Sequence, residues 1–222
     1  MIPLFTFALT PSIFHSAPEI VGTSLFGVFL NALSGTYAYV KQHRVYFKAA
    51  IPFAIATLPG AILGSLVSDY FTGPTFSLSY GIFILIISAI MYWNSSNKKA
   101  IATNFDETLF IARKKLGIIL SMFVGFISSI FGIGGGIIHV PVMIYALAFP
   151  PHMATATSHF VLAVSSFMGV TSDIFLNHIV WIPALAVGFG AVIGAQIGAR
   201  LSKKTKPRSI ILLLCISLFL LG

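Results

Sequence analysis

The sequence is poor in charge, and above all in acidic charge. Only 8% of its 222 residues are charged, with five Asp and Glu against 13 Lys and Arg. Hydrophobic residues make up 57% of the chain, and the mean hydropathy is +0.98. A soluble domain of this size cannot bury so much apolar surface in one core. The scarcity of charge therefore excludes a soluble protein and predicts one that is integral to a membrane.

Cysteine and the usual catalytic signatures are also scarce. The single cysteine, Cys215, lies in an apolar run and excludes an intrachain disulfide. The chain has no G-x-S-x-G, H-E-x-x-H or phosphate-loop pattern, so we expect neither enzymatic activity nor a nucleotide or other cofactor. Ser158 and His159 are adjacent, point about 100° apart on a helix and cannot form a nucleophile–base pair. An intramembrane enzyme is thus only a distant alternative.

Long apolar runs alternate with short basic segments. Runs of about 17–25 residues can cross the bilayer as helices, and basic clusters between such runs are typical of cytoplasmic loops. The net charge of +8 therefore indicates no nucleic-acid partner. We predict a multi-pass, all-α protein of the inner (plasma) membrane, with the lipid bilayer as its partner. The N-terminus lacks the features of a cleaved signal peptide. The predicted segments are Met1–Leu9, Ala17–Val40, Phe47–Tyr70, Phe76–Trp93, Leu116–Ala148, Ala154–Leu176, Val180–Leu201 and Ile210–Leu221.

The two halves of the chain resemble each other. Several small and hydroxyl residues of the first half recur in the second half at one constant offset of 134 residues. Transporters are often internal duplications, so we predict a first repeat at 1–93, a basic cytoplasmic linker at 94–115 and a second repeat at 116–222. The matching landmarks are Thr23-Ser24 with Thr157-Ser158, Gly35 with Gly169, Gly60-Ala61 with Gly194-Ala195, and Gly64 with Gly198.

A glycine-rich break interrupts the segment Leu116–Ala148 at Gly132-Ile-Gly-Gly-Gly136. Each glycine costs a helix about 1 kcal/mol relative to alanine, and irregular backbone at membrane depth survives only where protein buries it or it lines a wet cavity. If this segment enters the membrane and returns without crossing, every basic loop becomes cytoplasmic and the repeats are inverted. The alternative is a tilted, broken single span.

These residues resemble the signature of the TauE/SafE sulfite exporter family. The resemblance covers nearly the whole chain, and it implies a duplicated, all-helical inner-membrane carrier of sulfite, organosulfonates and related anions that uses the proton gradient. One departure is that the family's first repeat also carries a glycine-rich break, whose counterpart here would precede Met1. The residues that carry the resemblance are Phe131–Gly136, Val140-Pro141, Pro150-Pro151-His152, Ala154, Thr157-Ser158 and the run Gly188–Arg200.

Candidate site residues follow from the break and from polar groups within the spans. Backbone N–H groups at helix ends favour anions, hydroxyls can donate to oxyanions, and ionisable residues in membranes are usually functional. The alternatives are close helix packing for the glycines and bonds to the preceding turn for the hydroxyls. His139, His152 and His159 match no metal pattern, so we expect no metal site, and Arg200 is assigned an anchoring role. The predicted substrate-binding residues are Gly132, Gly134, Gly135, Gly136, Thr157, Ser158, Thr23, Ser24 and Asn31, and the proton-coupling candidates are Asp173 and His159.

The sequence therefore predicts a secondary transporter of small sulfur-containing anions of the sulfite or organosulfonate type, coupled to protons. A transporter or channel for another small anion or for a metal ion is the first alternative. The sequence leaves the oligomeric state open.

Overall fold

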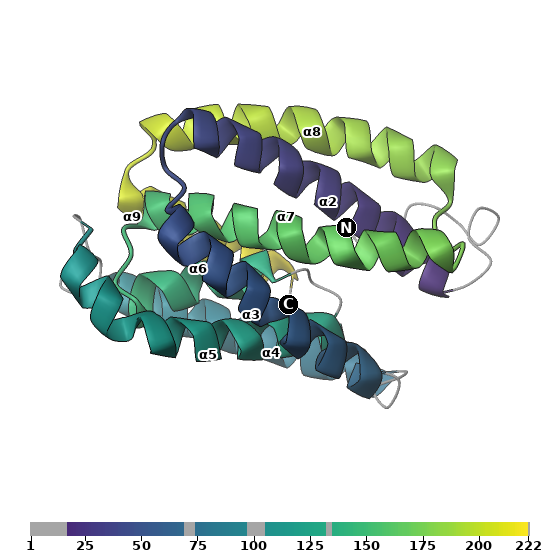
Figure 1. Cartoon of the computed structure of the whole chain (residues 1–222), viewed down its shortest axis with the longest axis horizontal. Coiled ribbons are helices and arrows are strands. Elements are labelled where there is room, and N and C mark those ends of the chain that lie inside the picture. The colour runs from purple at the N-terminus through teal and green to yellow at the C-terminus, as the bar shows by residue number, and fades with distance from the viewer. Residues whose placement is uncertain (1–16, 69–73, 97–104, 132–134, 222) are drawn as a thin grey trace.

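The computed structural model describes residues 17–68, 74–96, 105–131 and 135–221 (Figure 1). Across these ranges the regular structure is helical and contains no strand, which confirms the all-α prediction. The helices are α2 (Ala17–Lys41), α3 (Phe47–Ser68), α4 (Pro74–Ser96), α5 (Glu107–Phe131), α6 (Gly136–Pro141), the π-helical turn η2 (Val142–Ala146), α7 (Pro151–Phe175), α8 (Trp181–Lys204) and α9 (Pro207–Leu221).

Most predicted spans match these helices to within a few residues. The predicted segment Met1–Leu9 and the break residues Gly132 and Gly134 lie outside the described residues. The polar stretch predicted as a linker is partly helical, because α5 already begins at Glu107. Asp106 caps this helix: its Oδ1 accepts bonds from the backbone N–H of Thr108 at 2.9 Å and of Leu109 at 3.1 Å.

The segment with the glycine break forms a hairpin of α5 followed by α6 and η2. The guanidinium of Arg113 in α5 donates to the carbonyl of Ala146 at the end of η2, over 2.9 Å. The rings of Phe110 and Phe149 pack edge to face at 5.6 Å. The chain therefore returns to the end of the molecule from which α5 started, as the re-entrant alternative predicts.

One end of the molecule gathers the basic residues, and we call it the basic end. Here the side chain of Gln42 at the end of α2 donates to the carbonyl of Ala199 near the end of α8, at 3.2 Å. Lys48 at the start of α3 pairs with Glu107 at the start of α5, at 2.7 Å. Helices α2 and α8 thus finish at this end, whereas α3 and α5 begin there.

Helices α2 and α7 run side by side in opposite directions (Figure 1). The backbone N–H of Val180, after α7, donates to Thr23 near the start of α2 at 3.0 Å. The backbone N–H of Tyr46, after α2, donates to Thr157 near the start of α7 at 3.2 Å. Each helix therefore caps the helix that follows the other one.

The offset of 134 residues recurs in this geometry. Helices α2 and α7 begin and end 134 residues apart, and so do the starts of α3 and α8. The two reciprocal hydrogen bonds join residues at the same offset, and His43 and Asn177 adopt left-handed φ angles of 55° and 54° in the turns that follow α2 and α7. The duplication stays a prediction, which these correspondences support.

The outer surface of the bundle is apolar. Ile182 is 85% exposed and Phe189 is 71% exposed on α8, which suits contact with lipid rather than with water. Among the described residues, three helices are long and apolar enough to cross a membrane, at Phe47–Gly64, Pro151–Phe175 and Trp181–Lys204. The main buried cluster lies beneath them and includes Phe53, Met143 and Ile211.

Candidate functional site

The described part of the glycine break packs tightly between α5 and α7. A Cβ atom at Gly136 would lie 3.0 Å from the side chain of Leu162 in α7. A Cβ atom at Gly135 would lie 3.7 Å from both the hydroxyl of Ser128 in α5 and the ring of His139. Gly136 thus permits close packing, and Gly135 borders a group of polar side chains.

That polar group lies in the apolar interior of the hairpin. His139 is 1% exposed, and its Nε2 lies 3.0 Å from the hydroxyl of Ser121. Ser121 donates its own proton to the carbonyl of Gly117 at 2.7 Å, so His139 Nε2 carries the proton and donates to Ser121. His139 Nδ1 is buried and has no hydrogen-bond partner within the described structure. We call Ser121, Ser128 and His139 the hairpin polar cluster.

Sequence reasoning missed the two serines of this cluster and favoured packing for His139. Ser121 and Ser128 are seven residues apart and therefore share one face of α5. Two hydroxyls on one face of an otherwise apolar segment were a signal that could have found them. The contact with His139 was less accessible, because it depends on how α6 folds back along α5.

The hydroxyl pairs Thr23-Ser24 and Thr157-Ser158 are buried but lie far apart. Thr23 accepts from Val180, and Thr157 accepts from Tyr46 at the basic end. Because α2 and α7 are antiparallel, the two pairs lie at opposite ends of this helix pair, and the expectation that they share one cavity is wrong. Ser158 donates to the carbonyl of Thr155 at 3.0 Å, a bond to its own helix.

His159 lies in the contact between α2 and α7. Its Nδ1 is 3.1 Å from the carbonyl of Thr155, its ring packs edge to face on Tyr39 at 5.3 Å, and it fills the space above Gly35. Asn31 is half-buried on α2. Neither residue borders the hairpin polar cluster through a contact among the described residues.

Asp173 forms an ion pair with His178 at the end opposite to the basic end. The distance from Asp173 Oδ1 to His178 Nδ1 is 3.6 Å, and the side chains are 17% and 33% exposed. The first turns of α2 pack here, since a Cβ at Gly22 would lie 3.2 Å from the Asp173 carboxyl carbon. Asp173 is therefore partly accessible near the outer surface, at the end of α7.

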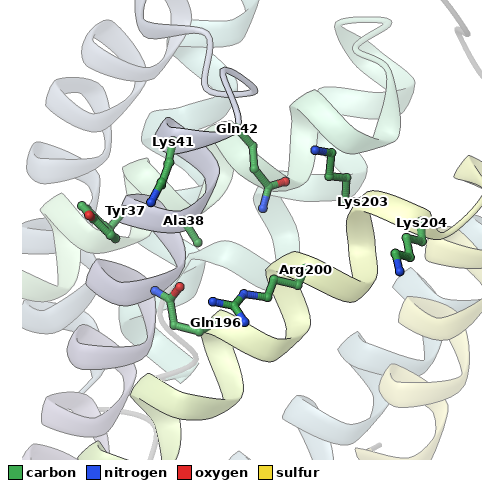
Figure 2. Close-up of a pocket in the computed structure, with 8 residues that line it drawn as sticks. All are labelled: Tyr37, Ala38, Lys41, Gln42, Gln196, Arg200, Lys203 and Lys204. Carbon is green, nitrogen blue, oxygen red and sulfur yellow. The ribbon is translucent and has the colours of Figure 1, made fainter.

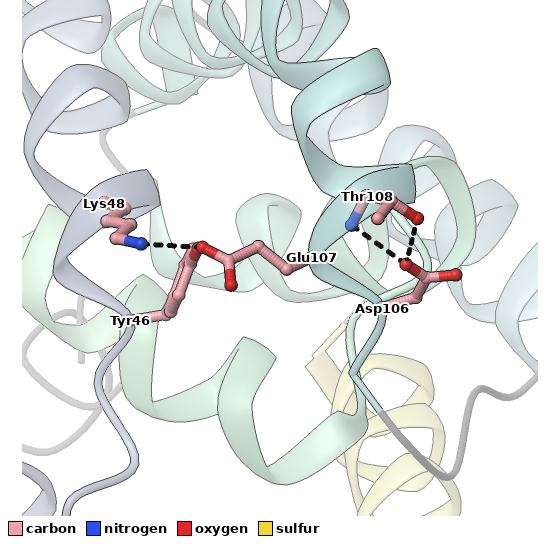
Figure 3. Close-up of polar contacts among 5 residues, drawn as sticks. All are labelled: Tyr46, Lys48, Asp106, Glu107 and Thr108. Atoms are coloured by element: carbon pink, nitrogen blue, oxygen red, sulfur yellow. Dashed lines mark hydrogen bonds and ion pairs between the residues drawn. The ribbon is translucent and has the colours of Figure 1, made fainter.

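The basic end carries a second group of polar contacts (Figure 3). Glu107 Oε1 accepts from the Tyr46 hydroxyl at 2.9 Å and from Lys48 at 2.7 Å. Burial raises the pKa of the Tyr46 hydroxyl above its ordinary value, and the hydrogen bond to Glu107 raises it further. These contacts fasten α3 to α5 next to the hairpin.

Arg200 lies beside a cavity at this end together with several lysines (Figure 2). Its predicted anchoring role left this cavity unnoticed, because the cavity forms only where α2 and α8 meet. Within the described ranges, no group of three or more His, Cys, Asp and Glu side chains could hold a metal ion.

Comparison with known proteins gives one consistent result. Residues 1–222 match the family described as sulfite exporter TauE/SafE. A probable membrane transporter protein of Bacillus subtilis is 35% identical over 217 residues, which cover 92% of this chain and 80% of that protein. A probable membrane transporter protein of Methanocaldococcus jannaschii is 29% identical, over 91% of this chain and 76% of that protein. No solved structure matches the chain. The resemblance found in the sequence is thereby confirmed, and the chain belongs to the TauE/SafE sulfite exporter family of membrane transporters.

Proposed function

We propose that this membrane transporter is a secondary, proton-coupled carrier of small sulfur-containing anions of the sulfite or organosulfonate type. It acts as a multi-pass protein of the inner (plasma) membrane. Two lines of support are the family, described as sulfite exporters, and the polar residues buried in the α5–α6 hairpin.

The hairpin polar cluster is the observation that carries this proposal. Buried polar groups are costly in an apolar interior unless they are paired or serve a function. Ser121 and Ser128 supply hydroxyls beside the backbone of Gly135, and His139 carries a proton on Nε2. These donors suit an oxyanion at membrane depth. The unpaired Nδ1 of His139 takes up the proton that accompanies the anion.

The two halves have an inverted arrangement in this proposal. The first repeat spans 1–93 and the second 116–222, with a cytoplasmic connection between them. Support comes from α2 and α7, which run antiparallel, and from the return of the α5–α6 hairpin to the basic end. Asp173 and His178 then provide a proton-accepting pair at the outer end.

The test is uptake of labelled sulfite into proteoliposomes of the purified protein. We expect saturable uptake that an inward proton gradient accelerates, that organosulfonates inhibit and that a protonophore reduces. His139→Ala abolishes the acceleration by the gradient, whereas His43→Asn, a change in an exposed turn, leaves it intact. Uptake of another anion or of a metal ion in place of sulfite would overturn the substrate assignment, and unitary currents would show a channel.

A further inference from the structure

A cavity of about 620 Å³ opens at the basic end, where α2 and α8 finish side by side (Figure 2). Helix α2 contributes Lys41 and Gln42 to its lining. Helix α8 contributes Gln196, Arg200, Lys203 and Lys204. We call this cavity the α2–α8 pocket. It is separate from the hairpin polar cluster, which lies between α5 and α6.

The two glutamines fix the walls of this pocket. Gln196 Nε2 donates to both the carbonyl and the hydroxyl of Ser34 on α2, each at 2.9 Å. Gln42 Nε2 donates to the carbonyl of Ala199 on α8 at 3.2 Å. Because these bonds tie the two helices together in both directions, the cations are held around a defined space.

The pocket carries an excess of positive charge. Four cationic side chains line it, and no Asp or Glu of the described part of the chain does so. The described carboxylates are placed elsewhere: Glu107 pairs with Lys48, Asp173 pairs with His178, and Asp106 caps α5. The carboxyl ends of two helices contribute only about half a negative charge each. They therefore offset about one of the four positive charges.

A fifth cationic group lies close by in the chain. Arg44 follows Gln42 in the turn after α2, and its backbone N–H donates to the carbonyl of Tyr39 at 3.1 Å. Its Nη1 is buried and has no hydrogen-bond partner among the described residues. An unsatisfied guanidinium nitrogen is costly, and it adds a donor at the same end of α2.

We propose that the α2–α8 pocket binds a tetrahedral oxyanion, of the phosphate or sulfonate class, at the basic face of the membrane. The guanidinium of Arg200 suits a two-pronged contact with such a group, and the lysines neutralise its remaining charge. The preference for positive charge in cytoplasmic loops explains why cations are at this end. It does not explain their arrangement around a walled cavity. The oxyanion comes either from a free anion or from the headgroup of an anionic phospholipid.

The experiment measures the thermal unfolding temperature of the detergent-purified full chain. One arm titrates inorganic phosphate and sulfite, with chloride at equal ionic strength as the reference. The other arm titrates dioctanoyl-phosphatidylglycerol, with dioctanoyl-phosphatidylcholine as the reference. The test variant is Arg200→Gln with Lys203→Gln. The matched control is Lys114→Gln with Lys115→Gln, which removes the same charge from exposed positions of α5 outside the pocket.

We expect stabilisation by at least one oxyanion above its reference, with an apparent Kd that rises about tenfold or more in the pocket variant and little in the control. A stronger effect of phosphatidylglycerol identifies a lipid headgroup, and a stronger effect of the free anions identifies a soluble ligand. No stabilisation in either arm, or an equal loss in both variants, would overturn the proposal. Because the readout is binding, this result is independent of which anion the protein transports.

Discussion

Helices α3 and α8 carry the same pair of glycines but use them differently. On α3, Gly60 and Gly64 are buried, and a Cβ atom at either position would clash with a backbone carbonyl of α5, that of Met122 or that of Phe126. On α8, Gly194 and Gly198 are exposed and have no described heavy atom within 4 Å. The sequence analysis assigned all four to packing, which holds for α3 and is wrong for α8 within the described structure.

The difference shows that a glycine pattern specifies a capacity rather than a contact. Small residues four positions apart let two backbones approach closely. Whether they do so depends on a partner helix. Helix α5 supplies that partner for α3, and Gly125 of α5 adds the reciprocal close approach to Thr57. Helix α8 instead packs its opposite face on α2, where Gly188 contacts Leu30.

The largest effect should come from filling the α3–α5 contact. We expect Gly60→Leu to destabilise the fold by more than about 3 kcal/mol, because the new side chain meets backbone that cannot move aside. Gly194→Leu, its counterpart on α8, should fold normally. Size-exclusion profiles and thermal unfolding in detergent would measure both. Equal damage from the two changes would contradict the difference between the helices.

A milder substitution should reverse the sign of the effect. Gly64→Ala should cost about 1–3 kcal/mol through overpacking against Phe126 and Ser129. Gly198→Ala should stabilise by up to about 1 kcal/mol, because alanine favours the helix and no described atom obstructs it. Unfolding temperatures of the two variants decide this point. Destabilisation by Gly198→Ala would mean that the face of α8 is occupied.

The reciprocal caps test whether α3 and α8 are equivalent at their starts. Thr157→Val removes the acceptor of the Tyr46 N–H before α3, and Thr23→Val removes that of the Val180 N–H before α8. Each change should cost about 1–2 kcal/mol, and the two costs should be similar. Thr171→Val is the control, since its hydroxyl bonds only within α7 among the described contacts. Markedly unequal costs would argue against matched roles for the two threonines.

The smallest effect should come from the cap of α5, the partner that α8 lacks in the described structure. Hydrogen bonds from the Thr108 hydroxyl and from the backbone N–H groups of Leu109 and Thr108 hold the pKa of Asp106 below its ordinary value of 3.8. The cap therefore contributes fully above pH 3.8 and is lost as the pH falls through the lower pKa of the folded state. Asp106→Ala should lower stability slightly at neutral pH and flatten its decline in acid. An unchanged acid profile would contradict this assignment.

The sequence was a good guide to the helices and a weaker one to the site. Apolar length places α2, α3, α7 and α8 almost to the residue, because the bilayer dictates helix length. It could not show that Ser121 faces His139, since that contact arises from the fold of the hairpin. The hydroxyl pairs were misplaced for a related reason. Antiparallel α2 and α7 carry equivalent residues to opposite ends, whereas a shared cavity requires equivalent residues near the middle of each helix.

The central claim of this account is that the α5–α6 hairpin returns to its starting side and leaves the two halves inverted. Cysteine accessibility in intact cells tests it most directly, in a Cys215→Ser background with single cysteines at His178 and Lys204. These positions lie at opposite ends of α8. We predict that a membrane-impermeant maleimide labels the His178→Cys variant from outside and the Lys204→Cys variant only after the membrane is permeabilised. Labelling of both variants from the same side would contradict the account.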